Sequence, residues 1–282
     1  MYVRPSAPRD IGGVIDDAIK LYRASFSTCW LIALIGSVLS AATLVFFISR
    51  FPAFMSVRDP AQLWQMLRPT PVWLWFLVPS LASLVLLGAI IACQSALAAG
   101  RAPMNVGQAI VTGFSRLHRQ LLTILLWLAY FVAIILLMLA PLPGFLKALS
   151  FLAWLIFAIY LWGRLQLWIV AVYADDAATL QAMGISWDFI QGHWWRAVTI
   201  LTVGIIIVIV ITMIFSFVAG LVLLMFRLDP MSLLIGNQIL SAAERVFVTS
   251  MIPALLVAMY YDLKLRREGG DLAARTKSLQ TA

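Results

Sequence analysis

The residues best able to do chemistry are charged side chains beside or inside long apolar runs. Arg164 interrupts an otherwise uncharged stretch over residues 149–173, and Asp175 and Asp176 follow directly. An arginine near the bilayer centre costs at least about 2.5–3.5 kcal/mol, so its side chain should face other helices or a wet cavity. Arg164 could therefore bind an anion or a lipid headgroup, or it could anchor two helices together. Its candidate partners are Gln94, Asp175, Asp176 and Glu244.

The two adjacent aspartates could hold a metal ion or a proton. Neighbouring residues on a helix point about 100° apart, however, so Asp175 and Asp176 cannot readily face one ion together. We expect them to cap a helix or to pair with an arginine.

A second ionisable group lies near the C-terminus, where Tyr260 and Tyr261 end an apolar run. Asp262 and Arg266 are four residues apart, and Lys264 and Glu268 repeat that spacing. Residues four apart are neighbours on a helix surface, so both pairs can form ion pairs. This segment is expected to anchor the chain where it leaves the membrane, with a docking site for a partner as the alternative.

The sequence offers little from which to build a catalytic or metal centre. Neither His118 nor His193 has a metal-binding motif or clustered carboxylates nearby. We therefore expect no metal, no cofactor and no enzymatic activity. Trp187, Trp194 and Trp195, together with His193 and Arg196, could form a headgroup pocket. An aromatic belt at the membrane interface is the commoner cause of such a cluster.

The composition is that of a polytopic membrane protein. Of 282 residues, 63% are hydrophobic and 11% are charged, against about 25% charged in soluble domains. The net charge of +8 does not indicate nucleic acid, because most basic residues flank apolar runs. We predict one all-α membrane helical bundle over residues 1–282. The six expected spans are residues 29–49, 72–98, 121–140, 149–173, 197–225 and 240–262, with a cytosolic tail over 263–282.

Some details of these spans can also be predicted. A partly structured loop containing Pro52 and Pro60 should join the first two spans. Residues 246–261 are uncharged but give only about 24 Å of helix, less than the roughly 30 Å that a bilayer core needs. The last span should therefore start earlier, with Glu244 and Arg245 near the outer interface, and Pro253 should kink it. Gly269 and Gly270 are expected to end its helix.

A pattern of three units runs through the chain. Asp10, Asn105 and Thr179 each stand where a helix cap would precede an amphipathic segment. A span, a loop and a second span follow in each unit. The interfacial helices are expected over residues 10–27, 105–119 and 179–196. Sequence identity between the units is slight, and any six-span protein has polar linkers, so the pattern is a hypothesis of structural repetition.

Lysine and arginine counts predict the orientation. With six spans, the side that holds both termini carries about twice as many of these residues as the opposite side. The positive-inside bias then places both termini in the cytosol. The richer side holds Arg4, Arg9, Lys20, Arg23, Arg101, Arg116, Arg119, Arg196, Lys264, Arg266, Arg267, Arg275 and Lys277; the other holds Arg50, Arg58, Arg68, Lys147, Arg227 and Arg245. The interfacial helices would then meet anionic lipid of the inner leaflet.

Two stretches resemble a known family. Tyr260–Leu272 reads YYDLKLRREGGDL and resembles the YyDLRxRxEGxDL signature of a bacterial membrane family, the membrane domain attached to some glycerophosphodiester phosphodiesterases. Thr179–Met225 resembles that family's middle segment, and Arg164 matches an arginine in the preceding span. Asp175 and Asp176 stand where the family usually has a glutamate. The resemblance implies an integral inner-membrane protein without the phosphodiesterase activity, which belongs to a soluble barrel domain that this chain has no room for.

These observations favour a non-enzymatic scaffold, accessory or regulatory protein of the bacterial inner membrane. Its expected contacts are the lipid bilayer, including anionic lipid, and a membrane-protein partner or further copies of itself. The alternative is a small transporter or lipid-handling protein with an anion or headgroup site around Arg164. A continuous polar cavity around Arg164 would favour transport, and a filled bundle would favour the scaffold.

Overall fold

The computed structural model describes residues 2–3, 5, 7–50, 72–141, 143–226 and 230–280. All regular structure within these ranges is helical, which confirms the all-α prediction. The predicted loop with Pro52 and Pro60 lies outside the described residues. The helices are α1 (Ile11–Arg50), α3 (Val72–Ala98), α4 (Val106–Ser115), α5 (Leu117–Leu139), α6 (Gly144–Leu165), α7 (Trp168–Ala174), α8 (Thr179–Ile190), α9 (Trp194–Met225), α10 (Pro230–Val248) and α11 (Met251–Gln280).

Six helical stretches within the described ranges are long and apolar enough to cross a membrane, which indicates a multi-pass membrane protein. Their mean hydropathies run from 1.6 to 3.1, and the most apolar belongs to α9. These stretches are Ile11–Phe46, Leu77–Ala98, Leu117–Leu139, Gly144–Ala174, Trp194–Met225 and Ile235–Arg267.

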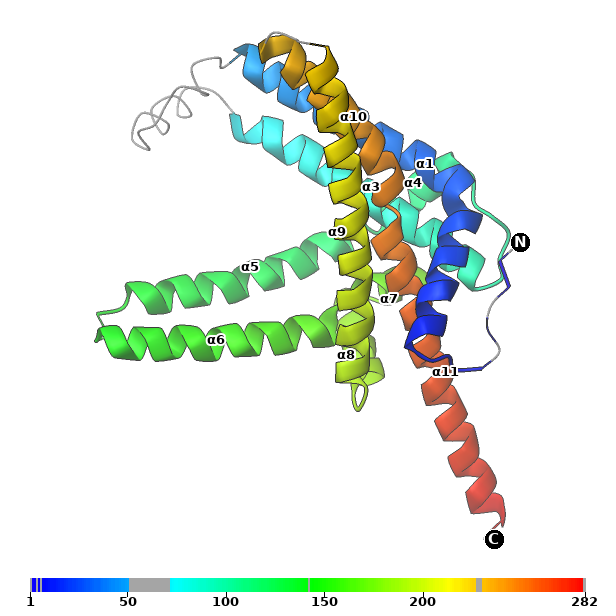
Figure 1. Cartoon of the computed structure of the whole chain (residues 1–282). Helices are drawn as coiled ribbons and strands as arrows, with labels where there is room; N and C mark the ends of the chain where they lie inside the picture. Colours follow the sequence, from blue (N-terminus) through cyan, green and yellow to red (C-terminus); the bar gives the residue numbers. More distant parts are fainter. Residues whose placement is uncertain are drawn as a thin grey trace.

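Three helical hairpins extend from one compact region (Figure 1). We call the hairpins arms: α1 with α3, α5 with α6, and α9 with α10. We call the compact region the hub. It comprises residues 11–28 of α1, residues 89–98 of α3, α4, α7, α8, residues 194–204 of α9 and residues 251–267 of α11. The first and third arms pack together through α1 and α10, whereas α5 and α6 contact mainly each other and elements near the hub.

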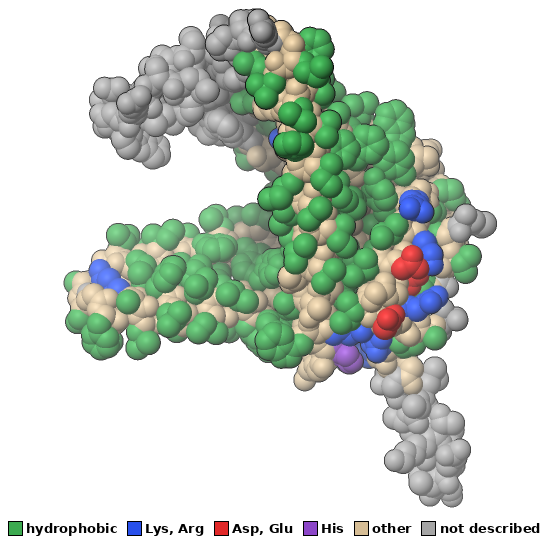
Figure 2. Space-filling model, in the orientation of Figure 1, with side chains coloured by type: hydrophobic (Ala, Val, Ile, Leu, Met, Phe, Trp, Pro, Cys, Tyr) green, Lys and Arg blue, Asp and Glu red, His purple; other side chains and the backbone are tan. Residues whose placement is uncertain are grey.

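The hub holds the larger of the two described clusters of buried side chains, and the arms are covered with apolar ones. Leu21, Val170 and Tyr260 are fully buried in this cluster, although they come from opposite ends and the middle of the chain. The arms expose leucine, isoleucine and phenylalanine along their length, and charged side chains gather on the visible face of the hub (Figure 2). Lipid is as apolar as these side chains, so a membrane removes the cost of their exposure.

The three amphipathic segments all pack in the hub. Helix α4 packs on α3, α8 packs on α7, and α1 packs on α11. The fourth and eighth residues of each of the three helices are buried: Val14 and Ala18, Ala109 and Gly113, and Ala182 and Ser186.

The buried positions of α4 allow a very close helix contact. A Cβ atom at Gly113 would lie 2.3 Å from the carbonyl oxygen of Val85 and 2.9 Å from the amide nitrogen of Ala89. Glycine therefore lets the backbone of α4 lie directly on the backbone of α3.

Two of the three predicted caps are confirmed. The Asp10 carboxylate accepts a hydrogen bond from the Gly13 amide at 2.9 Å. Asn105 and Gln108 form a reciprocal capping box, with bonds of 2.8 and 3.2 Å. The third prediction is wrong: Ala178 precedes α8, and the Thr179 hydroxyl instead donates to the Arg119 carbonyl at 3.2 Å. Thr179 thus ties α8 to the start of α5.

Several predicted helix boundaries also need correction. The first interfacial helix is not separate, because α1 is continuous from Ile11 to Arg50 and turns from the hub into the first arm (Figure 1). The predicted span 149–173 breaks between α6 and α7, at residues 166–167. The predicted helix end at Gly269–Gly270 is wrong, since α11 continues to Gln280. Glycine costs a helix only about 1 kcal/mol, which the flanking leucine, alanine and arginine residues can outweigh.

The last predicted span is divided at residues 249–250, between α10 and α11. Pro253 lies in the first turn of α11, where its missing N–H leaves no helical bond unmade. Glu244 and Arg245 lie in the last turns of α10, at the end facing the hub and far from the arm's tip. The expected earlier start of this helical segment is confirmed, because α10 begins at Pro230. The placement of both residues near the outer interface stays a prediction.

Candidate functional site

Asp262 is the centre of the charged network in the hub. Its side chain is only 5% exposed and accepts three hydrogen bonds. The donors are the backbone N–H of Arg9 at 2.8 Å, the Arg196 guanidinium at 3.0 Å and the Arg266 guanidinium at 3.0 Å. Both guanidiniums also donate to the Arg9 carbonyl. The carboxylate thus joins the N-terminal segment, the start of α9 and α11, and the predicted pair of Asp262 with Arg266 is confirmed.

Asp175, at the end of α7, makes a second link to α11. Its carboxylate accepts hydrogen bonds from the Tyr260 hydroxyl and from the Lys264 ammonium, the latter at 2.9 Å. The predicted pair of Lys264 with Glu268 cannot be compared, since the Glu268 side chain lies outside the described residues. Lys264 contacts Asp175 because the end of α7 lies beside α11.

Asp176 pairs with two arginines at the start of α5, whereas its neighbour Asp175 pairs with α11. Its carboxylate lies 2.7 Å from an Arg119 nitrogen and 3.2 Å from an Arg116 nitrogen. Its backbone has φ +55°, a left-handed conformation that aspartate tolerates better than most residues. That turn exposes the Asp176 and Ala177 carbonyls, which also accept hydrogen bonds from Arg119. The expected pairing with arginine is confirmed for Asp176, whereas Asp175 pairs with a lysine.

A buried uncharged link lies behind these ion pairs. The Gln120 amide donates to the Tyr173 hydroxyl, which in turn donates to the Gly113 carbonyl at 3.3 Å. Arg116 adds two bonds to the carbonyls of Val172 and Tyr173, at 3.1 and 3.0 Å. These contacts fix α4 and α5 against the end of α7.

Arg164 lies beside the hub but outside the ion-pair network. Its guanidinium packs over the Trp187 ring at 4.7 Å and the Tyr160 ring at 5.3 Å, as a cation over two aromatic faces. It also donates to the Tyr160 hydroxyl at 3.0 Å and to the Trp187 carbonyl at 3.2 Å. None of its four predicted partners appears among these contacts, and Trp187 of α8 takes their place. Arg164 therefore anchors α6 to α8.

The remaining candidates separate into two places. The Tyr261 hydroxyl donates to the Ser95 carbonyl at 3.3 Å, inside the hub. Glu244 makes no hydrogen bond or ion pair with any residue in the described ranges. Gln94 binds the Ser250 carbonyl at 2.9 Å, at the break between α10 and α11. The structure therefore brings Asp175, Asp176, Tyr261, Asp262 and Arg266 together in the hub, with Arg164 at its edge and Glu244 away from it.

Sequence reasoning missed the basic partners of these carboxylates. None of Arg116, Arg119 and Arg196 was predicted as the partner of a particular aspartate, although each lies where an amphipathic segment passes into a span. In the structure they pair with Asp176, which follows α7, and with Asp262 of α11. The shared position of the three arginines was the signal from which these pairs could have been predicted.

The contacts of this site join helix ends. The hub carboxylates accept hydrogen bonds from guanidinium, ammonium, hydroxyl or amide donors of other segments. Within the described ranges, no group of three His, Cys, Asp or Glu side chains could hold a metal ion.

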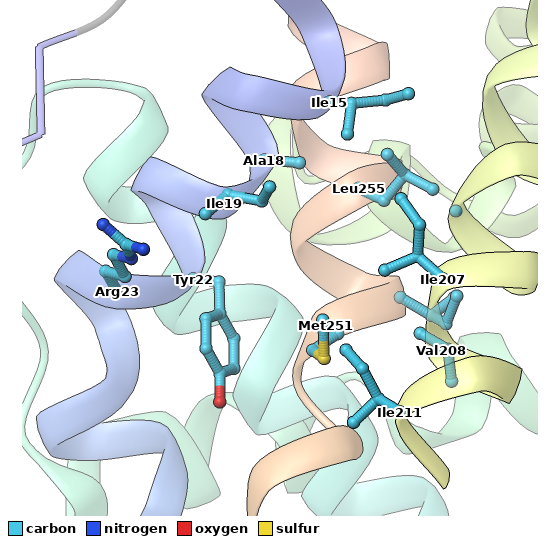
Figure 3. Close-up of a pocket in the computed structure, with 12 residues that line it drawn as sticks. Ile15, Ala18, Ile19, Tyr22, Arg23, Ile207, Val208, Ile211, Met251 and Leu255 are labelled. Carbon is cyan, nitrogen blue, oxygen red and sulfur yellow. The ribbon is translucent and has the colours of Figure 1, made fainter. Parts of the chain in front are cut away.

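An apolar pocket of about 250 Å³ opens beside the hub, between α1, α9 and α11 (Figure 3). Ile15, Ala18 and Leu255 line its hub end, while Ile207 and Ile211 line the side formed by α9. Tyr22 also lines the pocket, below Ala18 and Ile19 in the same view. The lining is almost entirely hydrocarbon, so the pocket suits an acyl chain or an apolar side chain and not a polar substrate.

Comparison with known proteins found no matching family model, no matching curated protein and no matching solved structure.

Proposed function

We propose that the chain is a non-enzymatic scaffold or accessory subunit of a bacterial inner membrane. The hub would lie at the cytosolic surface, and the arms would cross the bilayer as three repeats of an interfacial helix and two spans. Helix α6 has 22 residues, about 33 Å of length, which matches a bilayer core of roughly 30 Å. The basic residues of the hub would face anionic headgroups, as the positive-inside bias requires.

The observation that carries this proposal is the Asp262 junction. A carboxylate that is 5% exposed and fastened to Arg9, Arg196 and Arg266 joins the two ends of the chain to its third unit. Such a junction fixes the arms at their inner ends and leaves their apolar faces available to lipid and to partner helices. The resemblance at Tyr260–Leu272 points the same way, since Asp262 and Arg266 belong to that motif.

The α5–α6 arm is the surface that we assign to a partner. It stands apart from the other two arms (Figure 1) and is braced internally by stacking of Tyr130 on Trp154, with ring centroids 5.5 Å apart. Its outer face includes Leu128 and Leu136, both mostly exposed. We propose that transmembrane helices of a second copy or of another membrane protein pack there.

Native mass spectrometry of the gently extracted full chain tests this role. The scaffold proposal predicts a homo-oligomer or a stoichiometric complex that is lost when Leu128 and Leu136 are both changed to Trp. The matched control changes Met213 and Phe217, which are equally exposed on α9, to Trp and should keep the complex. A monomer in the wild type, or a complex that both double variants keep equally well, contradicts the proposal.

A lipid-handling role is the second candidate, and the apolar pocket favours it. This role does not require Arg164 as a ligand, because its guanidinium already donates hydrogen bonds to Tyr160 and Trp187. Ile207→Trp would fill the pocket, whereas Ile209→Trp places the same ring on the lipid-facing side of α9. Loss of a co-purifying lipid only with Ile207→Trp supports lipid handling, and retention with both variants contradicts it.

A further inference from the structure

A polar cleft of about 130 Å³ lies between the first arm and α10, beside the break between α10 and α11. About half of its lining residues are apolar, and the others are polar. The residues without a polar side chain are Ile32, Ala33, Gly36, Leu86, Leu87 and Ile90. The polar lining residues are Ser37 and Ser40 of α1, Ser83 of α3, Arg245 of α10 and Thr249.

The cleft contains hydrogen-bond donors that are not otherwise used. Ser37 is 4% exposed, lines the cleft and makes no hydrogen bond with any described residue. Arg245 is exposed and has no hydrogen bond or ion pair within the described part of the chain. Because Ser37 lines the cleft, water or a ligand in the cleft can bind its hydroxyl. Ser40 and Ser83 donate to carbonyls of their own helices and keep lone pairs free.

The helix break adds further unsatisfied polar atoms. The side-chain oxygens of Gln94 and Ser250 are buried without a partner in the described structure. Ser250 directly follows Thr249 of the cleft, and Gln94 lies one turn beyond Ile90 on α3. The 30-residue helix α11 begins here, and the N-terminus of a helix carries a partial positive charge. Broken spans of this kind form ion and substrate sites in membrane proteins, because their free backbone groups need a polar partner.

The electrostatics of the cleft favour an anion. Arg245 is the only charged residue in its described lining, which does not include Glu244. A basic residue at this position in an apolar span is expensive unless it has a counter-charge or a wet surrounding. We propose that the cleft binds an oxyanion of phosphate-like chemistry, held by the Arg245 guanidinium and the Ser37 and Thr249 hydroxyls. This site does not depend on the scaffold role.

Thiol labelling tests whether the cleft is wet and positive. Ser83→Cys places a thiol in its lining, while the native Cys29 and Cys93 are buried and the unsubstituted chain serves as the blank. The probes are an anionic and a cationic methanethiosulfonate reagent, each rate being divided by that reagent's rate with a free thiol. The anionic reagent should react at least about fivefold faster, and Arg245→Gln should abolish this preference. No labelling by either reagent, or a preference that survives Arg245→Gln, overturns the proposal.

Binding measurements distinguish a lipid headgroup from a free anion. The first experiment measures binding of inorganic phosphate by equilibrium dialysis against the full chain in phosphatidylcholine nanodiscs. The second measures retained phosphatidylglycerol by native mass spectrometry. In one of the two experiments, saturable binding should fall at least about fivefold with Arg245→Gln and with Ser37→Ala, but not with Lys147→Gln near the tip of the α5–α6 hairpin. The Ser37→Ala variant guards against loss of folding in the arginine variant. Absence of saturable binding in both experiments, or equal binding by all variants, overturns the proposal.

Discussion

Removing the charge of Asp262 should destabilise the hub more than removing the charge of an exposed carboxylate. Asp262→Asn keeps the side-chain shape but leaves the Arg196 and Arg266 guanidiniums, which are 18% and 27% exposed, without their counter-charge. Breaking a buried ion pair costs about 3–5 kcal/mol. Because both guanidiniums retain some contact with solvent and with the Arg9 carbonyl, we expect the lower end, about 3 kcal/mol. That is about two orders of magnitude in the unfolding equilibrium.

The assay is reversible unfolding of the purified chain in mixed micelles, followed by tryptophan fluorescence and circular dichroism. Asp16→Asn is the matched control, because its ion pair with Lys20 is more than half exposed on both sides. Exposed pairs contribute about 0–1 kcal/mol, so this variant should be near neutral. If Asp262→Asn lowers the free energy of unfolding no more than Asp16→Asn does, the junction does not hold the hub together.

Three further variants test other contacts of the hub in the same unfolding assay. Gly113→Ala should lower the free energy of unfolding by about 1–3 kcal/mol, because its methyl group would clash with the backbone of α3. Gly107→Ala, whose methyl group would contact no other helix, should be neutral or slightly stabilising. Equal effects of the two substitutions would contradict the close packing. Tyr173→Phe should cost about 1–3 kcal/mol by leaving the buried Gln120 amide without its acceptor, and an unchanged stability would count against this link. Arg164→Leu should cost about 1–2 kcal/mol through the lost aromatic and carbonyl contacts, whereas wild-type stability would show that Arg164 is no anchor.

Local signals in the sequence predicted the helices well. Apolar runs located all six candidate spans, and the side chains of Asp10 and Asn105 marked two helix starts that the structure confirms. The spacing of Asp262 and Arg266 predicted their ion pair, because both residues lie on one helix. These features depend on residues within a few positions of one another, which periodicity and capping rules describe directly.

Contacts between distant segments could not be predicted in the same way. Arg164 was expected to find a carboxylate, but its partner is the face of Trp187, which no charge pattern indicates. The contact of Lys264 with Asp175 joins two helices, and no spacing within one helix predicts it. The division of the last span at residues 249–250 was not predicted either. Each of these outcomes depends on how the units pack, and the polar cleft became visible only from that packing.

The packing of the helices in the hub gives a physical reason for the positions of its ion pairs. Each amphipathic segment buries two small or medium side chains against the inner end of another span, which offers modest apolar area. The ion pairs of Asp175, Asp176 and Asp262 then fix the orientation of those ends. We infer that buried charge here specifies how the three units join more than it adds to total stability.

The central claim is that the hub lies in the cytosol while the arms cross the membrane, and labelling from one side tests it most directly. Asp188→Cys places an exposed thiol on the hub, and Lys147→Cys places one beside the turn between α5 and α6. A membrane-impermeant maleimide should label the hub thiol only in inside-out vesicles and the arm thiol only in right-side-out vesicles. Labelling of both thiols from the same side, or the reverse pattern, would contradict the account.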